Sequence, residues 1–167
     1  LHLGRTNLKQ LPPEIGRLSK LVKLHVPRNG LTELPPEIGQ LQSLTALHLS
    51  NNRLTRLPPE IGLLSNLTQL YASDCDLSEL PAEVGQLTNL TTAHLSGNRL
   101  LAVPPGVADL GKLRTLDLRN NARDGKSLKE LPPDLAQALR ERKTTVQLGA
   151  GAPAGGHVHG SGKGGKK

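Results

Sequence analysis

The strongest constraint on this chain is a pattern of apolar residues that repeats every 23 residues. The clearest unit, LTALHLSNNRLTRLPPEIGLLSN, begins at Leu44, and the next unit begins at Leu67. A unit of this length cannot bury its own apolar face, so successive units must stack into a solenoid. One apolar position recurs six times, at Leu1, Leu24, Leu47, Leu70, Ala93 and Leu116.

Each repeat predicts its own local structure. The alternation Leu47-His48-Leu49 has a period of two, which predicts a short strand with both leucines facing the core. An Asn shortly after the strand is expected to pair with backbone groups left free where the coil turns. We call this position the Asn column, and it reads Thr6, Asn29, Asn52, Cys75, Asn98 and Asn121.

The second half of each unit predicts a short helical turn. In the step Leu-Pro-Pro-Glu, Pro suits the first helical position and Glu suits the positive end of the turn. Glycines follow at the end of this turn, where they are expected to let the chain leave it for the next strand. They are Gly16, Gly39, Gly62 and Gly85.

The repeats divide the chain into one domain, 1–148, and a tail, 149–167. Residues 131–148 are expected to close the solenoid as a C-terminal cap, with a helix near 135–143 and a last strand at 144–148. No polar unit precedes Leu1, so an N-terminal cap is expected to be missing. The tail is rich in Gly and Lys and is expected to be disordered.

The pattern LxxLxLxxNxLxxLPxxIxxLxx, matched six times, resembles the leucine-rich repeat. The 23-residue unit and the step Leu-Pro-Pro-Glu-Ile-Gly resemble in particular the intracellular Ras-group proteins, including Ras-suppressor and Shoc-2-like proteins and their plant relatives. The resemblance implies an α/β repeat solenoid, a horseshoe with a parallel concave sheet and short helical or 3-10 turns on its convex side. It also implies a cytoplasmic scaffold without catalysis that binds small GTPases, phosphatases or other signalling proteins.

Several classes of function find no support in the sequence. The chain has one Cys, which excludes an intramolecular disulfide framework. No apolar run is long enough to span a bilayer, so membrane insertion is not expected. No nucleotide loop, nucleophile elbow or paired carboxylates suggest an enzyme or a cofactor. The basic tail carries His157 and His159 but lacks aromatic residues, so we do not expect it to bind nucleic acid.

Four histidines occupy the central position of the strand motif, at His2, His25, His48 and His94, with Tyr71 and Asp117 in the same position of other repeats. One interpretation is a stripe that binds metal or senses pH. The interpretation that we favour is a polar sheet face on which repeat duplication copied one residue. Parallel side chains in a flat row do not converge on a metal ion from several directions.

Cys75 replaces Asn in the Asn column, which predicts a structural thiol rather than a nucleophile. Asp74 and Asp76 flank Cys75 and could hold a cation. However, Arg53 and Arg99 lie one repeat away on either side of Asp76, so ion pairs between neighbouring coils are the better explanation.

The leading hypothesis is therefore a protein-interaction module that binds its partner on the concave sheet. We expect Tyr71 to be the main anchor, because the chain has no other Tyr and no Phe or Trp. The alternative is the recognition segment of a larger kinase or GTPase. The predicted partner-binding residues are His25, Arg28, His48, Arg53, Tyr71, Asp74, Asp76, His94, Arg99, Asp117 and Arg119.

Overall fold

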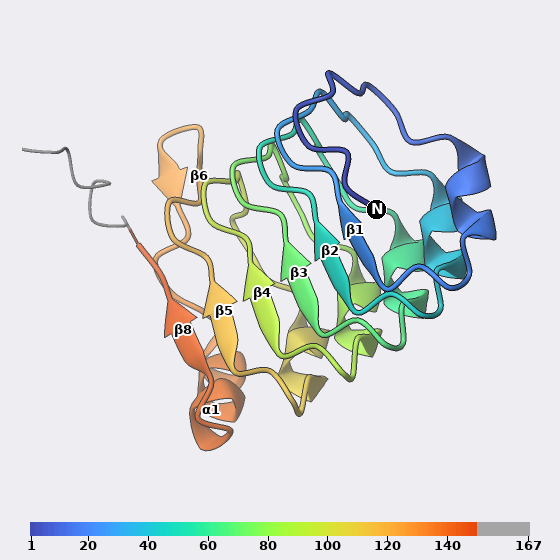
Figure 1. Cartoon of the computed structure of the whole chain (residues 1–167). Helices are drawn as coiled ribbons and strands as arrows, with labels where there is room; N and C mark the ends of the chain where they lie inside the picture. Colours follow the sequence, from blue (N-terminus) through green and yellow to red (C-terminus); the bar gives the residue numbers. More distant parts are fainter. Residues whose placement is uncertain (150–167) are drawn as a thin grey trace, which may run out of the picture.

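The computed structural model describes residues 1–149, so the predicted tail lies almost wholly outside the described residues. Six strands of three residues lie side by side in one parallel sheet (Figure 1). Strand positions one repeat apart pair directly, so Leu24 faces Leu47 and Leu47 faces Leu70. The strands are β1 (Lys23–His25), β2 (Ala46–His48), β3 (Gln69–Tyr71), β4 (Thr92–His94), β5 (Thr115–Asp117) and β8 (Thr145–Gln147).

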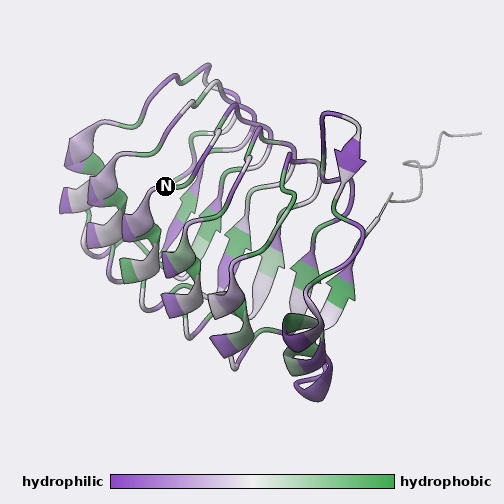
Figure 2. Ribbon diagram, turned by 180° about the vertical axis from the view of Figure 1, so that it is seen from behind, coloured by the Kyte–Doolittle hydropathy of each residue, from purple (hydrophilic) through white to green (hydrophobic). Residues whose placement is uncertain are grey.

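Five 3-10 turns lie on the opposite side of the solenoid from the sheet (Figure 1, Figure 2). Each is five residues long and follows a Pro, which is extended in the first four. In the first three, the Pro-Pro-Glu step starts the turn as the sequence predicts. The turns are η1 (Pro13–Arg17), η2 (Pro36–Gln40), η3 (Pro59–Leu63), η4 (Ala82–Gln86) and η5 (Pro105–Asp109).

Aliphatic side chains from every side of the coil fill the space between sheet and turns. Leu24, Leu47 and Leu70 enter it from the strands, and Ile38 and Ile61 enter it from the 3-10 turns, all almost fully buried. Because each repeat places the same residue types in the same slots, one continuous apolar core runs the length of the solenoid.

The two ends of the sheet differ. The first unit forms only an isolated bridge between His2 and His25, although Leu3 N–H donates to the His25 carbonyl at 2.7 Å. At the other end, α1 (Pro133–Glu141) packs beside η5, and β8 adds a strand to β5. α1 buries Leu135 and Leu139 against the last coil.

The sixth unit is longer than the others by five residues, 123–127, and this insertion forms a small hairpin that projects from the solenoid (Figure 1). Its strands are β6 (Ala122–Arg123) and β7 (Lys126–Ser127), which pair antiparallel. Asp124 and Gly125 connect them with φ of 50° and 75°. A two-residue loop with both φ angles positive is the preferred connection of a tight hairpin, and Asp-Gly is a preferred sequence for it.

The predicted role of the turn glycines is wrong. Gly16, Gly39, Gly62 and Gly85 do not have the positive φ that would let the chain reverse at that point. Instead, a Cβ placed on Gly39 would lie 2.7 Å from the Glu60 carbonyl oxygen of the next turn. The glycines are therefore needed because successive 3-10 turns stack backbone against backbone.

Candidate functional site

Aromatic rings form a continuous stack along the exposed face of the sheet. The ring centroids of His2 and His25 are 4.4 Å apart, those of His25 and His48 are 3.9 Å apart, and those of His48 and Tyr71 are 4.2 Å apart. Tyr71 and His94 follow at 5.1 Å, nearly parallel. The strand register produces this arrangement, because it pairs these positions directly across each ladder. We call these five residues the ring row.

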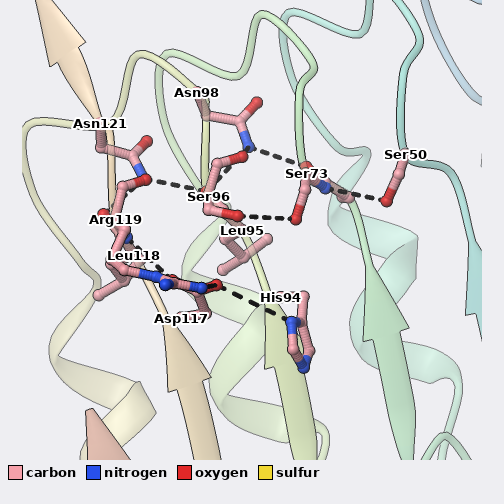
Figure 3. Close-up of polar contacts among 11 residues, drawn as sticks. Ser50, Ser73, His94, Leu95, Ser96, Asn98, Asp117, Leu118, Arg119 and Asn121 are labelled. Atoms are coloured by element: carbon pink, nitrogen blue, oxygen red, sulfur yellow. Dashed lines mark hydrogen bonds and ion pairs between the residues drawn. The ribbon is translucent and has the colours of Figure 1, made fainter. Parts of the chain in front are cut away.

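The ring row ends at a buried carboxylate. Asp117 has a side chain only 2% exposed and lies 3.9 Å from Nδ1 of His94. Arg119 donates to both carboxylate oxygens, from Nε at 2.9 Å and from Nη2 at 2.8 Å, and its backbone N–H also donates to Oδ1 (Figure 3). This bidentate pair fixes both side chains at the C-terminal end of β5.

The hydrogen bonds explain how Asp117 stays ionised while buried. Burial of Asp117 opposes the charged form, but the hydrogen bonds from the Arg119 side chain and backbone outweigh it. The pKa of Asp117 therefore lies below its usual value, and the pKa of Arg119 is raised by the same contacts.

The central histidines of the ring row are neutral near pH 7. Burial, together with the nearby positive charges of His25, Lys23 and His2, lowers the pKa of His48 to about 4. Burial and the neighbouring positive groups also lower the pKa of His25. Where His25 and His48 stack, the ring row therefore presents an aromatic surface with polar edges rather than a positively charged one.

A row of serine hydroxyls runs beside the ring row and was not predicted. Ser96 Oγ donates to Ser73 Oγ at 3.1 Å, and the Ser73 N–H donates to Ser50 Oγ at 3.2 Å (Figure 3). The three residues occupy one repeat position directly after the strand motif. That 23-residue spacing of identical polar residues was the signal that could have revealed the row.

The remaining predicted residues lie on the loops that follow the strands. Arg28 and Asp74 occupy one repeat position, both with a left-handed backbone. Asp76 pairs with Arg99 at 2.8 Å, as the spacing predicts. The predicted pair with Arg53 is absent from residues 1–149, because the Asp76 carboxylate turns toward the following coil instead.

Cys75 is a structural thiol in the described conformation. It is buried, and its Sγ donates to the Leu49 carbonyl oxygen at 3.5 Å. Burial is the main cause that raises the pKa of Cys75 to about 11, which leaves almost no reactive thiolate near neutral pH.

The described part of the chain contains no group of three or more His, Cys, Asp or Glu side chains arranged to hold a metal ion. Among residues 1–149, no helix has both the length and the apolar character needed to cross a membrane.

Comparison with known proteins identifies the architecture. A family model described as a leucine-rich repeat region matches residues 1–73. A search of curated proteins found no match. The leucine-rich repeat protein LIC12759 of Leptospira interrogans superposes with a TM-score of 0.74 and 35% identity, over 85% of this chain and 35% of that chain. The fold is a leucine-rich repeat solenoid.

Two plant receptors have similar structures. The peptide hormone receptor RGFR1, solved in complex with RGF2, has a TM-score of 0.74 and 31% identity, over 88% of this chain and 24% of the receptor. The second is the ectodomain of the Arabidopsis thaliana membrane receptor kinase GASSHO1/SCHENGEN3, solved with CASPARIAN STRIP INTEGRITY FACTOR 2. It has a TM-score of 0.69 and 32% identity, over 83% of this chain and 16% of the ectodomain. The chain spans about a third or less of the length of each of these three structures.

Proposed function

We propose that this leucine-rich repeat chain is a non-catalytic scaffold that binds a protein partner through its sheet face. The observation that carries the proposal is the ring row, a preformed aromatic surface held at one end by the Asp117–Arg119 pair. Its rings are already stacked, so little side-chain freedom is lost when a partner covers them. Tyr71 lies within the stack, between His48 and His94.

The similar structures support a polypeptide partner. Leucine-rich repeat domains bind protein partners. RGFR1 was solved in complex with RGF2, and GASSHO1/SCHENGEN3 was solved in complex with CASPARIAN STRIP INTEGRITY FACTOR 2. We further propose a cytoplasmic location and a role in small-GTPase-linked signalling, with a GTPase or phosphatase as partner. This finer assignment is supported only by the resemblance of the 23-residue unit to intracellular Ras-group proteins.

A second candidate function is supported by the length of the similar chains. This chain covers 16% of the GASSHO1 structure and 35% of the LIC12759 structure, so it corresponds to a segment of longer proteins. The chain would then be the recognition part of a multidomain kinase or GTPase. A reading frame that encodes a Gly-rich nucleotide loop next to the repeats would favour this candidate.

Affinity capture followed by a titration of two variants tests the scaffold function. Tyr71→Ala removes the central ring and is expected to weaken partner binding by more than about 1 kcal/mol. Glu60→Ala changes η3, on the opposite side of the solenoid, and is expected to leave binding unchanged. If Glu60→Ala abolishes binding while Tyr71→Ala has no effect, the partner binds the convex side of the solenoid and not the sheet face.

A further inference from the structure

Four basic residues gather on the loops at the N-terminal end of the solenoid, beside the sheet face. Arg5, Lys9, Arg28 and Arg53 line one open pocket of about 350 Å³. The other residues that line it are Asn7, Asn29 and Gly30, so no carboxylate contributes to the pocket. We call the four basic residues the basic rim.

None of the four basic rim residues forms an ion pair within residues 1–149. Ion pairs in this part of the chain involve other residues, such as Arg99 with Asp76 and Arg119 with Asp117. Arg99 occupies the same repeat position as Arg53, two units later, and it is paired whereas Arg53 is not. The positive charges of the rim are therefore available to a ligand.

Two rim residues stand where the backbone disfavours them. Arg5 and Arg28 have φ of 59° and 55°, in the left-handed region. Later repeats place residues better suited to this conformation at the same position: Asn51, Asp74, Gly97 and Asn120. Arginine offers the backbone no advantage here, and neither guanidinium forms a hydrogen bond within the described residues. A strained conformation without a structural gain points to a functional role.

We propose that the basic rim binds a segment rich in Asp and Glu in the protein partner that covers the sheet face. This inference rests on the proposed scaffold function and names the chemistry of one part of the partner. Two repeats after Arg28, the same repeat position holds the acidic residue Asp74. Attraction of an acidic segment is therefore confined to the N-terminal repeats. The charge pattern thus fixes the direction in which the partner lies along the sheet.

The same observations favour an acidic polypeptide over a nucleic acid. No aromatic ring lines the pocket on which a base could stack. A nucleic acid also needs a long basic groove to follow its backbone, whereas Asp74 and Asp76 interrupt the positive surface after Arg53.

The test is a fluorescence anisotropy titration of the full chain with a fluorescein-labelled polyglutamate peptide, at low and at physiological salt. Wild type is expected to bind, more weakly as salt rises. The double variant Arg28→Gln/Arg53→Gln is expected to lose about fivefold to tenfold in affinity. Lys20→Gln/Arg56→Gln, which removes the same charge away from the rim, is expected to bind like wild type.

Three results would overturn the proposal. The first is that wild type does not bind polyglutamate at low salt. The second is that both double variants lose the same affinity for it. The third is that a single-stranded oligonucleotide binds more tightly than polyglutamate and depends on the rim. The peptide titration needs no partner, so it is independent of the Tyr71→Ala experiment. If the rim variant binds polyglutamate like wild type while Tyr71→Ala still weakens partner binding, the rim alone is rejected. If only the rim variant shows an effect, the rim still binds acidic peptide, but binding of a partner across the sheet face is rejected together with the part of this inference that rests on it.

Discussion

At the scale of single residues, the Asn column holds the coils together by replacing missing backbone partners. Asn52 Oδ1 accepts from the Leu31 N–H at 3.1 Å, while its Nδ2 donates to the carbonyl oxygens of Val26 and Leu49 at 3.0 and 2.6 Å. Asn98 and Asn121 repeat this pattern with residues two and three units on. Each side chain therefore satisfies buried groups from two neighbouring coils.

This geometry makes opposite predictions for two members of the column. Asn52→Ala leaves the Leu31 N–H without its acceptor and removes the amide donor from the carbonyl oxygens of Val26 and Leu49. It should lower the free energy of unfolding by about 1 to 3 kcal/mol. Cys75→Asn should be neutral or mildly stabilising, because the amide can accept from the Leu54 N–H where sulfur is a weak acceptor. Urea unfolding at neutral pH measures both. An equal fall in both midpoints would show that the column is not the source of stability.

The ring row predicts a pH dependence of stability. The pKa of His48 is about 4 in the folded chain and near 6.5 when unfolded, so the unfolded state binds more protons between these values. Stability from this group is present above about pH 6.5 and is lost as pH falls toward 4. His25 faces His48 from β1 and Tyr71 faces it from β3. The positive charges of His25, and of Lys23 on the same strand, add to this effect.

Urea unfolding at pH 7 and pH 5 measures that loss without titrating Asp117, whose pKa lies lower. Wild type should have the lower midpoint at pH 5. His48→Gln keeps a planar polar group but cannot be protonated in this range, so its midpoint should fall less. A fall of equal size in the variant would show that His48 does not control the effect.

At the scale of elements, the stacking of 3-10 turns depends on glycine. Gly39→Ala would place a methyl group 2.7 Å from the Glu60 carbonyl oxygen and 3.0 Å from Glu60 Cβ, which forces neighbouring turns apart. We expect it to destabilise the chain by about 1 to 3 kcal/mol. Gly111→Ala is the control, because nothing lies within 4 Å of its added Cβ. Thermal unfolding that shifts equally for both variants would contradict close stacking.

At the scale of the whole molecule, the sheet is small for a stable interface. Six strands at ~4.8 Å spacing give a length of ~29 Å, and about five residues at ~3.3 Å give a width of ~17 Å. The projected face is on the order of 500 Å², below the ~800 Å² per partner of a standard interface. We therefore expect the partner titration to give a Kd in the micromolar range or weaker for this chain alone. A nanomolar Kd would mean that the loops supply most of the contact area.

The repeat, the strands, the 3-10 turns and the buried leucines could all be predicted from the sequence, because each depends on residue types at a fixed spacing. The sequence also predicted the Asn column and the Asp76–Arg99 pair, since a 23-residue offset fixes which residues meet. Features that depend on the distance between coils could be seen only in the tertiary structure. Only the stacked backbones show that Gly39 is required for close approach, and only the coil geometry turns Asp76 toward Arg99 and away from Arg53. The same stacking buries His48 and lowers its pKa. It also gathers Arg5, Lys9, Arg28 and Arg53 around one pocket, because residues far apart in the sequence become neighbours only when the coils stack.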